Sequence, residues 1–283
     1  GSKDHNVKLR EVAIKKGLKL NEYGLFKGAE SIAGKTEEEV YKALGLEYIE
    51  PEMREAAGEI ELSINKKLPK LIGYNDLLGN MQTHSDWSDG ETTIEEMAEA
   101  AMKAGLQYIL MTDHTRGLAM TGGADEKKLL KQMAEIDRFN KSSPASPRLR
   151  GAGKFQVAGF RILKGAEVNI GKNGELDMDE KVLSKLDVVG AAVHSHFNLS
   201  REDQTKRIIK TMENPNVDII FHLTGRLINK REAIQVDFEE ILKTAKKTGT
   251  ILEIDAYPDR LDIKDDFIKE CVAAGVKMSI GAD

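Results

Sequence analysis

The sequence predicts an α/β protein in which a closed or nearly closed (β/α) barrel follows a small α/β module. From about residue 79 to residue 283, apolar runs rich in β-branched residues alternate with helical patterns. This alternation is typical of parallel strands joined by crossover helices. About seven such runs are present, which favours a barrel, and a doubly wound open sheet is the alternative.

The composition limits the class of protein. With 283 residues, of which 40% are hydrophobic, the chain can bury a full core and a smaller attached unit. No apolar run approaches the roughly 18 residues of a membrane span, and no signal-peptide pattern opens the chain, so we expect a cytoplasmic protein without membrane contact. Cys271 is the only cysteine, which excludes an internal disulfide and a cysteine-based zinc site. The net charge of −5 argues against a generally basic surface for nucleic acid.

The chain divides into three expected regions. Residues 1–50 are expected to form a mixed α/β module, residues 51–78 lack a sustained period and are expected to be a linker, and residues 79–283 are expected to form the barrel. In the first region, helices are expected at 4–16 and 36–44, and short apolar segments lie at 18–26 and 46–49. In the barrel, strands are expected at 79–84, 107–112, 161–168, 187–193, 217–221, 250–255 and 276–283, and helices at about 93–104, 126–139, 201–213, 237–247 and 265–274.

Histidines and carboxylates gather where these apolar runs end. Because the carboxyl ends of parallel strands converge on one face, we expect these side chains to meet there. Imidazole and carboxylate groups are ligands for Zn²⁺, Mn²⁺ or Fe²⁺, and two or three such ions can activate water and hold phosphoester oxygens. A single histidine at a strand end is more often structural, but five of six histidines in such positions favour a metal site. The residues are His84, Asp113, His114, Glu167, His194, His196, His222, Asp255 and Asp283.

The short sequence motifs around these residues resemble those of a known family. THSDWSDG, TDH, GAEVNI, VHSHF, HLTGR and IGAD resemble the motifs of the polymerase and histidinol phosphatase (PHP) superfamily, in the version fused to the C-terminus of bacterial and archaeal family X DNA polymerases. The opening GSKDHNVKLREVAIKKGLKLNEYGLF is similar to the thumb subdomain of those polymerases. The resemblance covers essentially the whole chain. It implies a distorted (β/α)7 barrel with a site for up to three metal ions, preceded by a thumb.

The resemblance also implies which residues bind metal, and it shows two departures from the family pattern. Gln82 stands where the family has the first histidine of a His-x-His pair, and an amide is a poor ligand for a transition metal. The sequence stops at Asp283, before the family's last histidine, which we expect to be a boundary of the sequence rather than of the barrel. His196 has no assigned role. The implied metal ligands are His84, Asp89, His114, Glu167, His194, His222 and Asp283, of which His84, His114, Glu167, His194 and His222 are also the expected catalytic residues.

The N-terminal residues are expected to contact DNA. By the resemblance, Gly1, Asn6 and Arg10 match thumb positions that touch the incoming nucleotide or the minor groove. Asn6 and Arg10 would lie four residues apart on one helix face, and a solvated basic helix is the alternative. The palm carboxylates that hold Mg²⁺ in family X polymerases lie upstream of the position of Gly1. We therefore expect the polymerase core to be a partner in a full-length protein and this chain not to polymerise by itself.

Basic residues indicate further contacts with phosphate. The segment SSPASPRLRGAGK at 142–154 is loop-like and lies in a stretch without acidic residues, so it is expected either to attract a DNA backbone or to be an ordinary surface loop. Arg226 and Arg260 follow strand ends closely and are candidates to bind phosphate. A structural ion pair is the alternative for both.

These observations favour a metal-dependent phosphoesterase with Mn²⁺ or Zn²⁺ as cofactors. By the resemblance, it would act on DNA 3′ ends in gapped or recessed duplexes as a 3′–5′ exonuclease, with 3′-phosphatase or abasic-site activity as further options, in DNA repair. One alternative is a small-molecule phosphatase. The other is a degenerate barrel that binds DNA or braces the polymerase core, for which Gln82 is the main argument.

Overall fold

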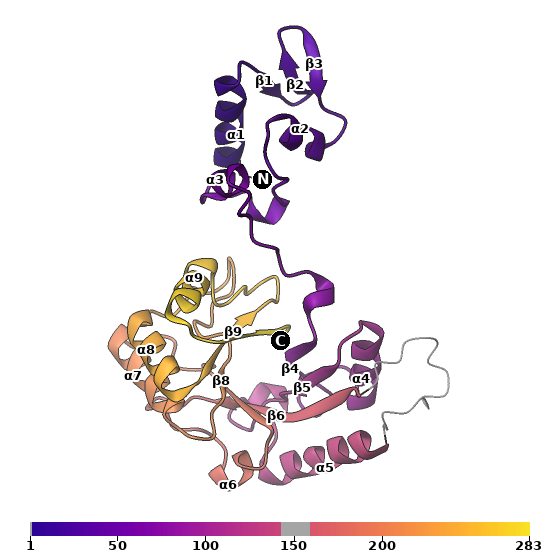
Figure 1. The fold of residues 1–283 in the computed structure, drawn as a ribbon. Coiled ribbons are helices and arrows are strands. Elements are labelled where there is room, and N and C mark those ends of the chain that lie inside the picture. Colours follow the sequence, from indigo (N-terminus) through magenta and orange to yellow (C-terminus); the bar gives the residue numbers. More distant parts are fainter. Residues whose placement is uncertain (1, 143–158) are drawn as a thin grey trace. The chain divides into compact units, whose positions relative to one another are not determined.

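The computed structural model describes residues 2–142 and 159–283, which form two compact units (Figure 1). The units are Gly1–Ile72 and Gly73–Asp283, and each is described by itself. The expected basic loop at 142–154 lies outside the described residues from residue 143 onward, as does Gly1. Within the described ranges, no helix is both long and apolar enough to cross a membrane.

The first unit contains three helices and a small antiparallel sheet. Its elements are α1 (Lys3–Lys15), β1 (Lys19–Asn21), β2 (Gly24–Lys27), β3 (Glu30–Ala33), α2 (Glu37–Ala43), the 3₁₀ helix η1 (Pro51–Met53) and α3 (Glu59–Ile64). Ser2 and Thr36 begin α1 and α2, because their hydroxyls accept hydrogen bonds from backbone N–H groups of the first turn. Ile60 of α3 is buried with Leu9 and Leu25 in one core. Part of the segment 51–78 therefore folds with the first unit; α3 has only six residues and shows no period in the sequence.

A buried polar network ties α1 to α3 in this unit. His5 Nδ1 lies 2.5 Å from Glu59 Oε1, and His5 Nε2 lies 2.8 Å from the Tyr41 hydroxyl. Glu59 also accepts hydrogen bonds from the backbone N–H groups of Ala56 and Ala57. Burial alone would raise the pKa of Glu59, but these hydrogen bonds outweigh it and lower the pKa. His5, the histidine outside the strand ends, is therefore structural.

The second unit is a seven-stranded parallel barrel that is nearly closed, which confirms the predicted fold over the doubly wound alternative. The strands are β4 (Gly79–Thr83), β5 (Tyr108–Met111), β6 (Arg161–Asn169), β7 (Val188–Ala192), β8 (Ile219–Ile220), β9 (Ile251–Asp255) and β10 (Met278–Gly281), hydrogen-bonded in chain order from β4 to β10. The two edge strands approach each other: the Ala282 N–H, just after β10, donates to Asn80 Oδ1 of β4 at 3.1 Å.

Helices connect the strands and cover the outside of the sheet (Figure 1). Side chains cap the start of several of them: Thr93 and Glu96 form a reciprocal capping box at α4, and Ser200 and Asp237 cap α7 and α8. The short α6 was not predicted. The helices are α4 (Ile94–Lys103), α5 (Glu126–Ser142), α6 (Glu180–Leu183), α7 (Arg201–Met212), α8 (Phe238–Thr248) and α9 (Asp265–Ala274), with 3₁₀ turns η2 (Tyr74–Asp76) and η3 (Ala119–Thr121).

Apolar side chains fill one part of the barrel interior. Leu110, Ala192, Ile219 and Phe221 form this inner core, separate from the apolar layers under the helices. Gly190 provides the space for Phe221, because a methyl group on Gly190 would overlap the aromatic ring. Successive strand residues alternate between the interior and the helices, so the polar residues at the carboxyl ends of the strands face one another above this core.

Candidate metal centre

Four imidazoles surround the buried carboxylate of Glu167. Glu167 lies on β6 and is fully buried. Its Oε1 lies 2.8 Å from His222 Nε2 and 3.0 Å from His194 Nε2. Its Oε2 lies 3.2 Å from His114 Nδ1 and 3.4 Å from His84 Nε2. The structure thus brings together the five residues that the sequence predicted to be catalytic.

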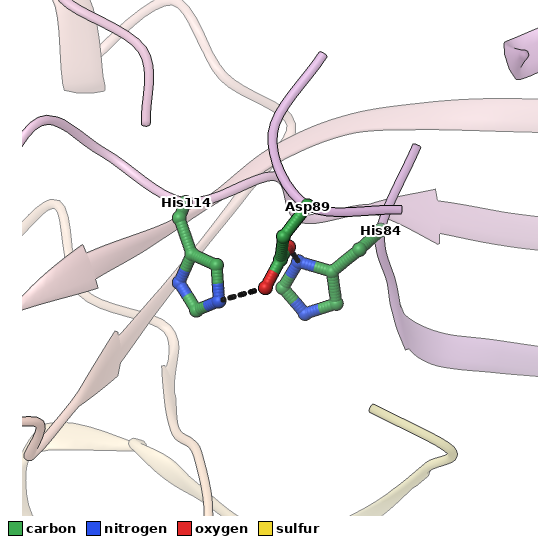
Figure 2. A group of neighbouring side chains, drawn as sticks. All are labelled: His84, Asp89 and His114. Atoms are coloured by element: carbon green, nitrogen blue, oxygen red, sulfur yellow. Dashed lines mark ion pairs between the residues drawn. The ribbon is translucent and has the colours of Figure 1, made fainter. Parts of the chain in front are cut away.

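Two aspartates complete this cluster. Asp89, in the loop between β4 and α4, places Oδ1 3.7 Å from His84 Nδ1 and Oδ2 3.5 Å from His114 Nε2 (Figure 2). Asp283, which follows β10, places Oδ1 3.1 Å from His84 Nε2. The His84 ring therefore faces a different aspartate with each of its nitrogens. Hereafter, the metal cluster means His84, Asp89, His114, Glu167, His194, His222 and Asp283.

The metal cluster fits divalent cations. Donor atoms of six of its seven residues form three overlapping groups, each within 4.8 Å: His84 with Asp89 and His114, His114 with Glu167 and His194, and His84 with Glu167 and Asp283. His222 joins the cluster through its contact with Glu167. Among the described residues, His84 Nδ1, His114 Nδ1 and Glu167 Oε2 are buried without a hydrogen-bond partner. A buried polar atom without a partner costs about 1–3 kcal/mol, and a bound cation would remove this cost. Nitrogen and carboxylate donors suit Zn²⁺ and Mn²⁺.

Burial and negative charge compete in setting the pKa values of the cluster. Burial opposes a charge on His84, but the hydrogen bond to Asp283 and the charge of Glu167 outweigh it and raise the pKa to about 9. For His222 burial is again outweighed, by Glu167, and the pKa is about 9. Burial lowers the pKa of His114. Although burial would raise the pKa of Glu167, the neighbouring histidines hold it well below its usual value. The cluster is therefore an anionic site that attracts protons or metal ions.

Asp113 holds the loop that carries Asp89. The Asp113 carboxylate accepts hydrogen bonds from Ser85 N at 2.8 Å, Ser85 Oγ at 2.7 Å and Ser88 Oγ at 2.5 Å, and a further one from the side chain of Gln132. Through the two serines, this carboxylate fixes the start of the loop between β4 and α4. The sequence located Asp113 at a strand end but did not reveal this role.

Gln82 faces the cluster from β4, two residues before His84. Its side chain is fully buried, and Nε2 donates a hydrogen bond to Asp283 Oδ1 at 3.1 Å. Among the described residues, the amide oxygen of Gln82 is one of the buried polar atoms without a hydrogen-bond partner. Gln82 and His84 thus share one carboxylate oxygen of Asp283. The amide adds no charge to the site.

The predicted phosphate ligands make contacts within the protein. Arg260 Nε lies 3.2 Å from Asp255 Oδ2, and Arg260 Nη2 lies 2.9 Å from Asp283 Oδ2. Arg226 Nε donates to the carbonyl of Arg260 at 2.8 Å, and its Nη2 donates to the carbonyl of Leu261. Arg260 lines the cleft described below, whereas Arg226 supports the loop on which Arg260 lies.

The other candidate residues are exposed. His196 lies after β7, has a φ of 55° and is exposed. Unlike His194, it does not belong to the metal cluster. Asn6 and Arg10 are exposed on α1, and Asn6 Nδ2 donates to the Ser2 carbonyl at 3.1 Å. Neither residue is needed for the core of the first unit, so both are available to a ligand.

A cleft of about 460 Å³ opens onto one side of the metal cluster. Tyr257, which is half-exposed, and Arg260 contribute an aromatic ring and a cation to its wall. The sequence did not indicate Tyr257, because a lone tyrosine after a strand carries no spacing signal. A cleft of this size accommodates a nucleotide-sized ligand. The cluster residues that line it are His84, Asp89, His114 and Asp283, together with Gln82.

Comparisons with known proteins agree with this geometry. Residues 80–257 match the PHP domain family and residues 1–55 match the DNA polymerase beta thumb. The whole chain is 38% identical to the DNA polymerase/3′-5′ exonuclease PolX of Bacillus subtilis (strain 168), and it spans about half, 47%, of that protein. Over 68% of its length it is 33% identical to a "Probable phosphatase" of Thermoanaerobacter sp. (strain X514), 72% of which is covered.

A solved structure has the same fold. It is described as a "putative histidinol phosphatase" from Listeria monocytogenes and matches with a TM-score of 0.51 and 12% identity, covering 72% of this chain and 94% of that one. The two family matches and the similarity to the Bacillus protein confirm the resemblance inferred from the motifs. The chain belongs to the PHP domain family and carries a DNA polymerase beta thumb ahead of its PHP domain.

Proposed function

We propose that this chain is the metal-dependent 3′–5′ exonuclease part of a family X DNA polymerase that serves DNA repair. The observation that carries the proposal is the metal cluster, in which four imidazoles surround the Glu167 carboxylate beside a nucleotide-sized cleft. Divalent ions held there would supply polarisation of a phosphodiester and a water of lowered pKa. The seven residues of the cluster are the proposed ligands.

The residues of the chain would prepare this site in three ways. Glu167 keeps the four imidazole rings oriented toward one point by contacting all of them. Arg260, oriented by Asp255 and Asp283, would donate hydrogen bonds from its cleft-facing guanidinium to a phosphate oxygen. Tyr257 would offer its half-exposed ring to a nucleobase at the wall of the cleft.

Two observations support DNA as the substrate. The first unit matches a polymerase thumb and exposes Asn6 and Arg10 on one helix. The similar Bacillus protein is described as both a polymerase and a 3′–5′ exonuclease. We propose the polymerase core as the partner, with its own Mg²⁺ ions, and recessed or gapped 3′ ends as the substrate. Removal of 3′-phosphates and processing of abasic sites would use the same chemistry.

A second candidate is a small-molecule phosphatase. It is favoured by relatives that are named as phosphatases, because the matched region covers 72% of the length of each of two such relatives. These relatives share the barrel with this chain, so the barrel alone does not decide between a DNA end and a small phosphate monoester. A non-enzymatic DNA-binding module is the interpretation that a failed assay would favour.

The test compares a DNA substrate with a small ester. The purified chain is incubated with a 5′-labelled duplex that has a recessed 3′ end, or with p-nitrophenyl phosphate, in Mn²⁺, Zn²⁺ or Mg²⁺. We expect stepwise shortening of the DNA with Mn²⁺, loss of this activity with EDTA and in Glu167→Gln, and full activity in Glu239→Gln, whose carboxylate is exposed on α8. Cleavage of the ester alone would establish the second candidate, and no cleavage with any ion would refute both.

A further inference from the structure

Asn169 connects a histidine of the metal cluster to a carboxylate outside it. Asn169 is the last residue of β6, two residues beyond Glu167. Its Oδ1 lies 2.6 Å from His194 Nδ1. Its Nδ2 lies 2.7 Å from Asp177 Oδ2 and 3.2 Å from Thr115 Oγ1. The three side chains of Asp177, Asn169 and His194 form a continuous line of hydrogen bonds that ends at the metal cluster.

The chemistry of these groups determines where the proton of His194 lies. An ionised carboxylate only accepts hydrogen bonds, so the amide NH₂ of Asn169 must face Asp177. The amide oxygen of Asn169 then faces His194, and it requires a donor. His194 Nδ1 must therefore carry the proton, and the lone pair of the neutral ring lies on Nε2. Without Asp177, Asn169 could turn over and donate to Nδ1 instead, which would place the ring proton on Nε2.

Nε2 is the nitrogen that faces the metal cluster. It lies 3.0 Å from Glu167 Oε1, and His194 belongs to the ligand group that also contains His114. A lone pair and a carboxylate oxygen at this distance repel each other unless a proton or a metal ion lies between them. We propose that Asp177 and Asn169 are positioning residues that fix His194 with Nε2 as its metal-binding nitrogen. The inference rests on the proposed metal-dependent function and assigns one nitrogen of that site.

The surroundings of Asp177 indicate a site built for this purpose. The chain turns back after β6 through a bridge between Ile170 and Leu176, which brings Asp177 beside Asn169. The carboxylate also accepts hydrogen bonds from Asn169 N at 2.9 Å, Thr115 Oγ1 at 2.7 Å and Gly117 N at 2.6 Å. A Cβ atom on Gly117 would lie 2.5 Å from Asp177 Oδ2, so the backbone approach requires glycine. One carboxylate thus orients the segment after His114 as well as the amide that holds His194.

Three variants and one control separate this role from a structural one. Asn169→Ala removes the acceptor for His194 Nδ1. Asp177→Asn removes the charge that orients the Asn169 amide. The double variant, Asn169→Asp together with Asp177→Asn, exchanges the two groups, so that a carboxylate at position 169 accepts from both His194 and the new amide. Asp179→Asn is the matched control, because Asp179 caps α6 through Lys181 N and does not touch the line of hydrogen bonds.

The first measurement is Zn²⁺ affinity, by calorimetric titration of the full chain without DNA. We expect the Zn²⁺ affinity to fall by about 10- to 100-fold in Asn169→Ala and Asp177→Asn, a size typical of groups that orient metal ligands. The exchanged double variant should regain part of this loss, which a variant that merely unfolds cannot do. Asp179→Asn should match the unaltered chain. Affinities of Asp177→Asn and Asp179→Asn that agree within about twofold would overturn the inference.

The second measurement is the position of the ring proton, by ¹⁵N NMR of the His194 side chain in the Zn²⁺-loaded chain. We expect the proton on Nδ1 and Zn²⁺ on Nε2 in the unaltered chain, and loss of this single arrangement in Asp177→Asn. A proton on Nε2 in the unaltered chain would overturn the inference. A chain that shows the expected proton and Zn²⁺ affinities but leaves DNA and phosphate esters uncut would refute the proposed function alone.

Discussion

Binding of divalent ions to the metal cluster should release protons, and pH is the perturbation that reveals it. Although burial disfavours a charged ring, Asp283 and Glu167 raise the pKa of His84 to about 9, and Glu167 raises that of His222 to about 9. In the metal-free chain we therefore expect both rings to carry a proton on each nitrogen, and hence a positive charge, at neutral pH. A histidine binds metal only through an unprotonated nitrogen. Ion binding must displace these protons, and this becomes easier as the pH rises toward 9.

The size of the effect follows from the number of rings. Each displaced proton costs about 1.4 kcal/mol for every pH unit below the pKa, which is about tenfold in affinity. The apparent association constant for Mn²⁺ should therefore rise by about 100-fold from pH 7 to pH 8 if both His84 and His222 are ligands, and by about tenfold if only one is. Above about pH 9 the dependence should disappear, because both rings are then neutral without an ion.

Calorimetric titration with Mn²⁺ in two buffers of different ionisation enthalpy counts the protons released. We expect about two protons for the unaltered chain near pH 7 and about one for His222→Ala. His196→Ala, which changes an exposed histidine apart from the cluster, should still release two. Binding heats that do not depend on the buffer, with equal affinities at pH 7 and pH 8, would show that these rings are not protonated or are not ligands.

The same pKa values predict the opposite dependence for the stability of the metal-free chain. The pKa of a histidine is about 6.5 in an unfolded chain, and the folded values for His84 and His222 are about 9. Their contribution to stability is fully present below about pH 6.5 and is lost as the pH rises through 9. The metal-free chain should therefore unfold at a lower urea concentration at pH 9 than at pH 7. Excess Mn²⁺ should remove this difference.

Four further changes test other parts of the structure. Gln82→His should raise the Mn²⁺ content and, if the proposed function holds, the rate of DNA cleavage, because an imidazole replaces a weak amide ligand beside Asp283. A gain in neither quantity would show that an imidazole at position 82 adds no metal ligand. Asp113→Ala should lower Mn²⁺ affinity with little change in the circular dichroism of the barrel, since it frees the loop that carries Asp89. Gly190→Ala should lower the free energy of unfolding by about 1–3 kcal/mol through overpacking of the inner core, measured in urea. Glu59→Gln should destabilise the first unit above about pH 4.5 and have little effect in acid, because the lowered pKa of Glu59 gives a contribution that is lost as pH falls; equal unfolding midpoints of the two chains at pH 7 would contradict this.

The strands of the barrel were predictable because they are buried on both faces and appear as continuous apolar runs. The expected run at 187–193 corresponds to β7 at Val188–Ala192, and the other six strands also lie inside their expected ranges or within one residue of them. The run at 217–221 forms only the two-residue strand β8. His222 follows it with a φ of 25°, and its Nε2 lies 2.8 Å from Glu167 Oε1. The four residues of α6 were missed, since fewer than two turns show no helical period.

The positions of the histidines were predictable, but the groups that orient them were not. Strand ends are visible as the end of an apolar run, and parallel strands place these ends on one face, so His84, His114 and His194 were expected to meet. The contact of Asn169 with His194 and the contacts of Asp113 with the loop after β4 join segments that are distant in sequence. Such contacts depend on loop conformation, and a single sequence contains no spacing that predicts them.

The strand-end pattern does not distinguish the carboxylates around the cluster from one another, whereas the directions of their pKa shifts do. Asp255 is the last residue of β9, and Glu167 likewise lies near the end of β6. Glu253 lies two residues before Asp255, on the same face of β9. Burial raises the pKa of Asp255 to about 6 and raises that of Glu253 well above its usual value. The pKa values of Glu167 and Asp283 are lowered instead, because histidines of the cluster outweigh their burial. Negative charge is therefore favoured on the carboxylates that contact imidazoles, whereas burial favours the neutral form of Glu253, and we expect Glu253 not to be a ligand. Carboxylates whose environments separate their pKa values in this way have different roles in one site, so replacing Glu253 by Gln should leave Mn²⁺ affinity unchanged where Glu167→Gln abolishes it.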